Sequence, residues 1–542
     1  MKLRHISYIA IAAIGFASCE PEFDNPVEDG GYFDQGSADF TTYVALGNSL
    51  TAGYADGALY IRGQENSFPN ILAQQFMQVG GGEFTQPLMN DNLGGLLLGG
   101  NQIAAPRLKL TLVEGSPSPV PVDGTPTTEV TNTLSGGFNN MGVPGAKSFH
   151  LLAPGYGNVA GVQTGQANPY FVRFRSAENT TVLEDAVAQN PTFFSLWIGN
   201  NDVLSYATSG GIGVDQTGNF DPSTYGPNDI TDPNVFGGAY TQIVDGMISA
   251  GASSGVVLNI PDVASTAFFN TVPTQPISPA DLEGQLATLN GTYAQLNQAF
   301  AFLGVPERSI QFSESGPSGL VVKDESLPDM SAQLTAVLTG AGVPPAQAQI
   351  FGQQYGQARQ TIYEPELVTP SDTSDDADRT DYEDLILLTT SSVIGVVNED
   401  RVATLVGMGV PQAEAAQLSI NGITYPLEDQ YVLIKAEQDE VAAATTAYNQ
   451  TIKAITDANN LAFVDANALL DQLANGGLSL EDGTFLTSEF ATGGAFSLDG
   501  IHLTPRGYAF IANEIIKAIE LKYEAEIPNV NVGQYSEGPA LY

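Results

Sequence analysis

The sequence predicts the α/β class, with a parallel sheet at its centre, from two observations. The first is a series of short apolar runs that end in turn residues, at residues 43–46, 193–198, 256–260 and 461–464. The second is that helical patterns separate these runs, and strands that alternate with helices are typical of a parallel sheet covered on both faces. The chain has 542 residues, of which 43% are hydrophobic, and this is enough apolar material for a large core.

Two of the intervening segments have the clearest helical periodicity. In residues 281–304 the apolar side chains recur at alternating steps of four and three, which is one face of a helix. They are Leu282, Leu286, Leu289, Tyr293, Leu296, Phe300 and Leu303. Residues 430–457 repeat the pattern with Val441, Tyr448, Ile452 and Ile455 and lead directly into the run at 461. Both stripes are interpreted as core packing.

The first residues are predicted to be a processing signal rather than part of the fold. Lys2 and Arg4 make a basic start, an apolar run covers 6–16, and Ala17-Ser18-Cys19 is a small-residue site. The end of the run, "FASC", resembles the lipobox of bacterial lipoproteins, although its Phe is less usual there than Leu. That resemblance implies a signal peptide over 1–18, lipidation of Cys19, and export to the outer membrane, facing either the periplasm or the cell surface. The alternative is an ordinary secretory signal in which Cys19 is incidental.

Composition and charge predict how the mature chain begins and which partners and cross-links it can have. Residues 19–40 are acidic and rich in Pro and Gly, which predicts a flexible tether. The formal net charge of −42 would repel nucleic acid and anionic membrane surfaces, so no nucleic-acid partner is expected. Cys19 is the only cysteine. We therefore predict no disulfide and no thiolate metal site in the mature chain.

Three segments are predicted as insertions in the α/β pattern. Residues 84–135 and 207–235 are rich in Gly, Pro, Asn and Thr, and residues 271–429 are long enough to form a cap over a site. The last of these contains "SESGPSG", which suggests a hairpin, and the acidic "SDTSDDADRTDYED". The acidic stretch lacks the Gly turn and terminal Glu of an EF-hand, so it is interpreted as a solvated loop without metal.

Ser49 is the first candidate for chemistry. The strand predicted at 43–46 runs into Gly47-Asn48-Ser49 and then into a predicted helix. A strand–turn–helix of this kind lifts a hydroxyl into the open above a sheet. The same serine is also a favoured helix N-cap. The stretch alone does not decide between a nucleophile and a cap.

Histidine is scarce, and only one has a carboxylate neighbour in sequence. Asp499 precedes His502 by three residues, in a turn just before a helix predicted to begin at Thr504-Pro505. This spacing lets the carboxylate reach Nδ1 of the imidazole and leaves Nε2 as the acceptor that a serine nucleophile needs. His150 has no such neighbour and is predicted to be a structural or surface residue, with a contact to substrate beside the site as the alternative.

Two further segments offer hydrogen-bond donors for an oxyanion. "NNMGVPGAKS" places Gly142 in a Gly-rich turn, where an amide could face a substrate. "FFSLWIGNNDV" places Asn201 just beyond a hydrophobic strand, where open α/β sheets bind ligands. Each segment is weak evidence by itself, because Gly turns and Asn-Asp helix caps are common.

The order of these four segments resembles the conserved blocks of the SGNH, or GDSL, hydrolase superfamily, in a lipoprotein branch. The resemblance covers 41–80, 136–206, 255–270 and 430–522, within a domain of 41–525 that is followed by a C-terminal extension of 526–542. It implies a flavodoxin-like three-layer sandwich of five parallel strands, with the second strand near 138–141. The usual Gly-Asp-Ser-Leu reads Gly-Asn-Ser-Leu here, which removes one negative charge beside the serine.

Carried onto this sequence, the resemblance implies a catalytic triad and an oxyanion hole. Ser49 would be the nucleophile, His502 the general base and acid, and Asp499 the residue that orients it. The hole would be formed by the amides of Ser49 and Gly142 and the side chain of Asn201. The expected activity is hydrolysis of a carboxylic ester, of lipase or esterase type, by a monomer without cofactor or metal.

Two other functions stay open at this stage. The substrate could be an acetylated sugar, which would make the protein a carbohydrate O-deacetylase of the same fold. The protein could also be a non-catalytic surface lipoprotein that binds a glycan or nutrient, since a fold alone does not settle function. The complete set of Ser, Gly, Asn, Asp and His favours the enzyme, because a binding module has no need of a base paired with its orienting acid.

Overall fold

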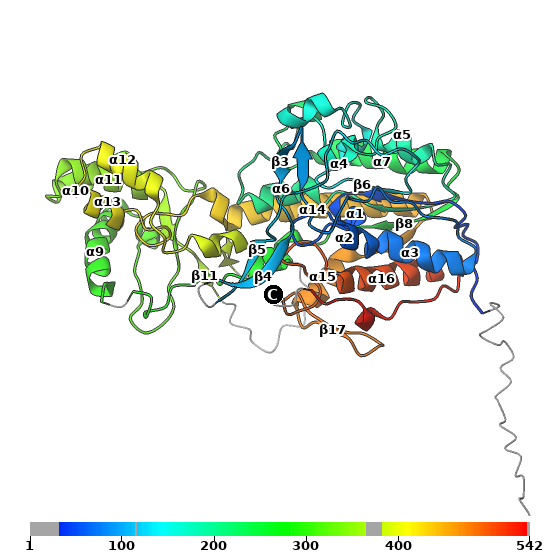
Figure 1. The fold of residues 1–542 in the computed structure, drawn as a ribbon. Helices are drawn as coiled ribbons and strands as arrows, with labels where there is room; N and C mark the ends of the chain where they lie inside the picture. The colour runs from blue at the N-terminus through cyan, green and yellow to red at the C-terminus, as the bar shows by residue number, and fades with distance from the viewer. Residues whose placement is uncertain (1–31, 114–115, 283, 365–381, 539–542) are drawn as a thin grey trace, which may run out of the picture.

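The computed structural model describes residues 32–113, 116–282, 284–364 and 382–538. Its body is built around one five-stranded sheet in which every pairing is parallel (Figure 1). The strands are β1 (Tyr43–Gly47), β6 (Asn140–Gly142), β7 (Phe193–Trp197), β8 (Ser254–Leu258) and β15 (Ala462–Val464), in the spatial order β6-β1-β7-β8-β15. The predicted α/β class with five parallel strands is confirmed.

The strand order creates a switch point beside the predicted nucleophile. Counted along the chain, the sheet strands lie in the order 2-1-3-4-5, so the connections leaving β1 and β6 run to opposite sides. In doubly wound sheets of this order, ligands bind beyond the carboxyl ends of the strands at that point. Gly47 pairs with Gly142 of β6 and with Trp197 of β7. The segments that follow these three strands therefore leave the sheet side by side.

The second sheet strand begins later than predicted. It was expected near 138–141, but pairing starts at Asn140. Asn139 uses its side-chain nitrogen to donate to the Tyr43 carbonyl oxygen at 2.9 Å, and its backbone N–H donates to Thr85. The strand is therefore short, and Gly142 is its last residue rather than part of a turn.

Helices cover both faces of the sheet, as the alternation of β1 shows. Tyr43 and Ala45 lie in one buried cluster, whereas Val44 and Leu46 lie in the other. The first cluster is closed by α3 (Phe68–Phe76), α15 (Ala466–Ala474) and α16 (Pro505–Tyr523). The second is closed by α5 (Val182–Val187), α6 (Asn201–Thr208), α7 (Pro233–Ser249) and α14 (Lys435–Ala458). Shorter helices of the body are α1 (Ser49–Ala52), α2 (Ile61–Glu65), α4 (Pro169–Val172) and α8 (Ala267–Asn270).

The two helices with the clearest periodicity are present but begin later than predicted. The first is α9 (Leu286–Leu303), and it cannot extend back through Gly284, whose φ of 77° is in the left-handed region. The second is α14, which begins at Lys435 because residues 432–433 form a short strand instead. Helical periodicity therefore located both elements without fixing their starts.

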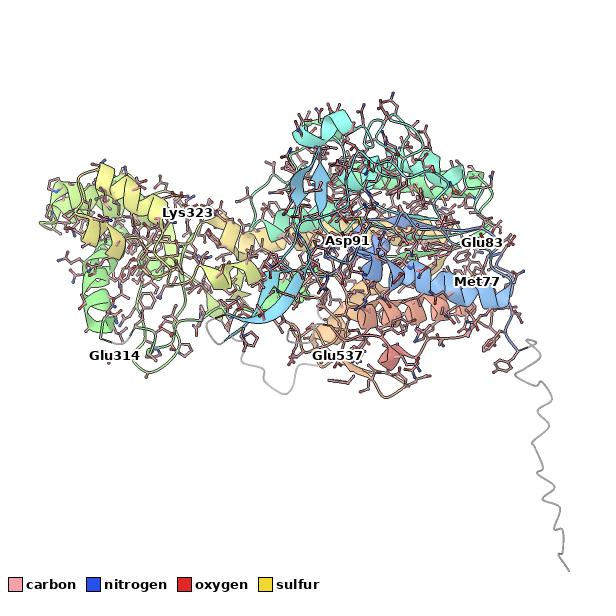
Figure 2. The ribbon with its side chains drawn as sticks, in the orientation of Figure 1. Met77, Glu83, Asp91, Glu314, Lys323 and Glu537 are labelled. Atoms are coloured by element: carbon pink, nitrogen blue, oxygen red, sulfur yellow. The ribbon has the colours of Figure 1, made fainter. Side chains whose placement is uncertain are left out.

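The long insertion forms a lobe with its own core. Its helices besides α9 are α10 (Ser331–Gly340), α11 (Pro345–Tyr355), α12 (Glu399–Gly407) and α13 (Gln412–Gln417). Its strands are β9 (Val321–Lys323), β10 (Ala358–Gln360), β11 (Tyr363–Glu364), β12 (Tyr382–Glu383), β13 (Leu385–Ile386) and β14 (Val432–Leu433). A separate buried cluster joins these elements. The lobe projects from one end of the body, with Glu314 and Lys323 in the lobe and Met77 and Glu83 at the far end of the body (Figure 2).

Two predictions for the lobe need correction or restriction. No hairpin forms around "SESGPSG": β9, which follows it, pairs with β10 from residues 358–360. The acidic stretch lies mostly outside the described residues, but its last carboxylate, Asp384, is 1% exposed and accepts two hydrogen bonds from Arg359. Arg359 also binds Asp324, so this buried guanidinium holds the strands of the lobe together.

The predicted signal peptide and Cys19 lie outside the described residues, whereas the end of the predicted tether is part of the fold. Phe40 is completely buried and its ring stacks on Phe76 with centroids 4.0 Å apart. Asp34 forms a backbone bridge with Glu526, so the start of the described chain meets the segment that follows α16. A flexible tether over all of 19–40 is therefore wrong for residues 34–40, because an aromatic residue anchors them to the core.

The insertion at 84–135 is more regular than predicted. It contains two hairpins, β2 (Leu96–Leu98) with β3 (Asn101–Ala104), and β4 (Leu108–Val113) with β5 (Ser116–Pro121). A third short pair, β16 (Leu478–Ser479) with β17 (Phe485–Leu486), precedes the segment that carries Asp499 and His502.

Among the described residues, no helix has both the length and the hydropathy that crossing a membrane requires.

Candidate active site

The turn that carries Ser49 is tight because it contains glycine and is capped by asparagine. A Cβ on Gly47 would lie 2.1 Å from Thr51 Oγ1 and 2.4 Å from the Trp197 carbonyl oxygen, so only glycine fits at the end of β1. Asn48 is the N-cap of α1, since its Oδ1 accepts from the Leu50 N–H at 3.0 Å. The cap is therefore Asn48, and the hydroxyl of Ser49 is left for another partner.

That partner is His502. Ser49 Oγ lies 2.8 Å from His502 Nε2, and His502 Nδ1 lies 2.9 Å from Asp499 Oδ2. These distances are within the range for hydrogen bonds between a nucleophile, its base and the orienting acid. Because Asp499 accepts the Nδ1 hydrogen, Nε2 is the acceptor for the serine hydroxyl. The three residues predicted from the sequence as a triad are thus brought together in the predicted order.

Asp499 is held as a charged acceptor by several donors. Its Oδ1 accepts the backbone N–H groups of Ile501 and His502 at 2.9 and 2.8 Å. Burial by itself would raise the pKa of Asp499, but attraction to the positive charge that His502 carries when it is protonated, together with these hydrogen bonds, outweighs burial and holds the pKa well below its usual range. The carboxylate therefore stays ionised and fixes the orientation of the imidazole.

The turn at residues 54–57 supports Asp499 from the other side, and sequence reasoning missed it. The Gly57 N–H donates to Asp499 Oδ2 at 2.8 Å, and the Asp56 N–H donates to Ser497 Oγ at 2.9 Å. The Asp56 carboxylate accepts in return from the Leu498 N–H at 3.1 Å. "DG" is a turn signal in the sequence. The sequence does not indicate that this turn contacts a segment more than 400 positions away.

Asn201, the predicted side-chain donor of the oxyanion hole, lies at the start of the helix that follows β7. It is the first residue of α6 and is 7% exposed. Its Nδ2 donates one hydrogen to the Ala146 carbonyl oxygen at 2.9 Å, which leaves the second hydrogen without an acceptor among the described residues. The preceding Asn200 accepts from Asn48 Nδ2 at 3.0 Å, so the start of α6 is tied to the serine turn across the switch point.

Gly142 does not fill the role predicted for it. Its N–H donates to Asn140 Oδ1 at 3.0 Å, so the amide is already engaged. A Cβ at this position would lie 2.3 Å from the backbone nitrogen of Ala52, which explains the glycine by the close packing of β6 on α1. The predicted assignment of this amide to the oxyanion hole is therefore wrong in this structure.

Gly145, three residues further on, has the properties that Gly142 lacks. It lies in the turn after β6 with a φ of 81°, it is exposed, and its N–H has no acceptor among the described residues. Its neighbour Ala146 is the residue whose carbonyl binds Asn201. The Ser49 N–H also has no acceptor in the described chain. Three free donors, from Ser49, Gly145 and Asn201, thus stand at the ends of adjacent strands.

A buried carboxylate fixes the Gly145 turn relative to Asn201. Asp202 is completely buried, and its two oxygens accept the N–H and the hydroxyl of Ser148, each at 2.8 Å. Ser148 follows the turn by three residues, and Asp202 follows Asn201 directly. Lys147, also buried, donates to the carbonyl of Asp229 in the insertion at 207–235. This cluster therefore joins two donor segments and the insertion into one unit.

His150 makes contacts that are typical of a structural histidine. Its Nδ1 accepts from the Lys147 N–H at 3.1 Å, and its ring stacks on Tyr156 with centroids 4.6 Å apart. Burial, and next the positive charge of Lys147, lower its pKa from 6.5 to about 3. The residue is thus held neutral by the fold.

No metal centre accompanies the triad in the described residues. No three His, Cys, Asp or Glu side chains of that part gather as metal ligands would. A cavity beside Gly142, lined also by Gln64 and Arg173, has a volume of about 10 Å³. That is room for about one water molecule, so it cannot hold a substrate.

No protein-family model, no curated protein and no solved structure matches this chain. Assignment of the site therefore rests on its own chemistry. An imidazole bound to a carboxylate can deprotonate a serine hydroxyl, and free donors at the ends of adjacent strands can stabilise a negative charge that develops there.

Proposed function

We propose that the protein is a serine hydrolase that cleaves carboxylic esters, of the SGNH or GDSL type. The observation that supports this best is the series Ser49 Oγ to His502 Nε2 at 2.8 Å and His502 Nδ1 to Asp499 Oδ2 at 2.9 Å. A serine paired with a neutral imidazole whose far nitrogen is bound by an ionised carboxylate is the arrangement that activates a hydroxyl.

The reaction would proceed in two halves. Ser49 Oγ attacks the ester carbonyl while His502 Nε2 takes its proton, and the same nitrogen then returns that proton to the departing alcohol. Water, deprotonated by His502 Nε2, attacks the carbonyl of the acyl-enzyme. His502 then returns that proton to Ser49 Oγ as the bond to the acyl group breaks, which releases the acid and the free serine. Asp499 keeps the imidazole oriented and stabilises its positive charge in both halves.

The negative charge on the tetrahedral oxygen would be met by three donors. They are the Ser49 N–H, the free hydrogen of Asn201 Nδ2 and the Gly145 N–H, which takes the place first assigned to Gly142. Donors that are already oriented before the charge develops lower the barrier without the cost of reorganising solvent. Asp202 and Ser148 would keep the last two donors in register.

The location of the protein is part of the same proposal. The lipobox-like end at Cys19 supports export and attachment to the bacterial outer membrane by a lipid. Lipid esters, other acyl esters and acetylated polysaccharide are all compatible with the site as described.

The proposal is tested by Ser49→Ala on a soluble short p-nitrophenyl ester. Loss of the nucleophile is expected to lower kcat by about 10⁶-fold, since the remaining groups cannot form the acyl-enzyme. A fluorophosphonate probe should label the wild-type chain at Ser49 and leave Ser49→Ala unlabelled. Wild-type turnover by Ser49→Ala would refute the assignment, and a wholly unreactive wild-type protein would favour the non-catalytic binder.

A further inference from the structure

The β4–β5 hairpin has one face made only of leucine and proline. In its register Leu108 pairs with Pro121, Leu110 with Pro119 and Leu112 with Pro117. Residues that pair across a ribbon point to the same face, and every second residue of a strand shares that face. The face comprises Leu108, Leu110, Leu112, Pro117, Pro119 and Pro121.

This apolar face is not used to build the described core. No residue of β4 or β5 belongs to any of the four buried clusters. Leu112 is 61% exposed, Pro117 and Pro121 are exposed, and Leu110 is only partly covered. A free two-stranded hairpin is marginally stable in water, and leucine side chains left in solvent add nothing to it. The face is therefore suited to contact with something outside the chain.

The prolines exclude the commonest protein partner of an exposed strand, at least along β5. The Val122 N–H donates to the Arg107 carbonyl oxygen at 2.8 Å, which makes this pair, and every second pair beyond it, hydrogen-bonded. Pro117, Pro119 and Pro121 occupy the alternate positions, where a backbone N–H would point outward. Because proline has no N–H, this edge cannot accept another strand.

The same feature suits a hydrocarbon environment. A backbone N–H without a partner is costly inside lipid, and the prolines remove three of them from the β5 edge. The ribbon also differs in charge from the rest of the chain, whose net charge is −42. Residues 101–123 contain two basic residues, Arg107 and Lys109, and two acidic residues, Glu114 and Asp123, and Lys109 pairs with Asp123 at 3.2 Å. The segment therefore has no formal net charge, so electrostatic repulsion from a membrane surface is small there.

The base of the ribbon lies next to the candidate triad. The Leu108 N–H donates to the Asp56 carbonyl oxygen at 2.7 Å, and the next residue, Gly57, donates its N–H to Asp499. A Cβ on Gly57 would lie 3.5 Å from the Leu108 side chain, so the apolar face begins at the turn that holds Asp499. In Figure 1 the ribbon stands at the edge of the body nearest the lobe.

We propose that the Leu/Pro face of the β4–β5 ribbon is a docking surface for a lipid layer, and that it brings the candidate triad close to that layer. The occupant is the apolar region of a membrane or lipid aggregate, not a strand of another protein. The docking does not depend on catalysis, so it can be measured whether or not Ser49 reacts.

The test places an environment-sensitive fluorophore on each face of the ribbon. The full chain carries Cys19→Ser, so that a single new cysteine is labelled, at Leu110→Cys, Leu112→Cys or, on the opposite face, Thr111→Cys. Phosphatidylcholine vesicles should shift the emission to shorter wavelength and raise its intensity at positions 110 and 112, and have little effect at 111. The rest of the chain is the same in all three proteins, which controls for insertion of other segments.

Two results would overturn the proposal. The first is the absence of a response at positions 110 and 112, or an equal response at 111. The second is a response at 110 and 112 that needs no vesicles and grows with protein concentration, which would make the face a contact between copies of the chain.

A matched pair of variants checks the same face without a label. Leu110→Asn with Leu112→Asn should weaken co-sedimentation with phosphatidylcholine vesicles by about tenfold or more, because two leucines lose their transfer into lipid. Val113→Asn with Val120→Asn puts asparagine at two apolar positions of the opposite face and should alter co-sedimentation less than about twofold on the same reasoning. Both pairs should hydrolyse a soluble short ester at the wild-type rate. Equal binding by the two double variants would contradict the proposal.

Discussion

The two halves of the candidate site differ in how they are built. In the proton-transfer half, Ser49, His502 and Asp499 meet through their side chains. In the oxyanion half, two of the three donors are backbone N–H groups, and one of these was assigned to the wrong glycine. A side chain carries its chemistry in its identity, whereas every residue except proline carries an N–H. Sequence therefore shows which hydroxyl or imidazole is available, but only packing shows which amide is free.

The variant with the largest expected effect on this comparison is Asp499→Asn, which tests the proton-transfer half of the site. The change keeps the size of the side chain but offers an amide where the His502 Nδ1–H needs an acceptor, so the imidazole would adopt the wrong tautomer. We expect kcat for a short ester to fall by about 10⁴-fold. Fluorophosphonate labelling should slow in parallel. Near wild-type turnover would mean that Asp499 only holds the loop and that another group orients His502.

The oxyanion half is tested next by Asn201→Ala. Loss of one donor to the transition state should lower kcat on the order of 10²–10³-fold, with little change in KM, because the hydrogen bond strengthens only as charge develops. The matched control is Asn200→Ala, which removes the link to Asn48 and leaves the Asn201 amide in place. A larger loss in the control would show that the tie across the switch point matters more than the donor.

Variants of Gly142 and Gly145 distinguish an effect on packing from an effect on catalysis. Gly142→Ala puts a methyl group 2.3 Å from the backbone of Ala52, so it should lower the free energy of unfolding by about 3 kcal/mol. For Gly145→Ala the nearest atom is Asn168 Nδ2 at 3.9 Å, and the cost is that of a left-handed backbone, about 1–2 kcal/mol. Gly145→Ala should nevertheless lower kcat more, because it moves the free amide. Urea titration and kcat of both variants give the comparison, and an unchanged kcat in Gly145→Ala would remove its amide from the hole.

The smallest expected effect concerns the second histidine. The pKa of His150 is lowered to about 3 in the fold, against about 6.5 when unfolded, so the neutral form is favoured by folding. Its contribution to stability is present above pH 6.5 and is lost as the pH falls from 6.5 toward 3. Between pH 7 and pH 5 the wild-type chain should therefore lose about 2 kcal/mol more unfolding free energy than His150→Gln. Equal losses in urea titrations would show that His150 titrates normally.

The fold was predictable where burial determines the pattern of apolar residues along the chain. A strand buried on both faces is a continuous apolar run, and β1, β7, β8 and β15 were located because each is such a run. The short β6 and the starts of α9 and α14 were misplaced, since Asn139, Gly284 and the strand at 432–433 act through local hydrogen bonds and backbone angles. Periodicity does not report on these.

Within the site, the sequence predicted the contact between residues that are close in the chain but not the contacts between distant segments. Asp499 and His502 are only three residues apart, so a single turn can bring their side chains together. The support from Asp56 and Gly57, and the link from Ser148 to Asp202, join segments that are far apart in the chain. Such contacts depend on the sheet order, which one sequence with scattered insertions does not reveal. The β4–β5 hairpin was likewise interpreted only as part of a surface insertion.

The hydrogen bond between Ser49 and His502 joins residues 453 positions apart. Closing it requires the strands of the sheet and the N-terminal end of α16 to be in place, with the whole inserted lobe between them. Contacts at such separation form late and slowly, because the entropy of closing the loop must be overcome first. Ser49 therefore lacks its imidazole partner until the chain has been synthesised through His502, and we expect a chain cut before His502 to be inactive toward esters however well its earlier parts are folded.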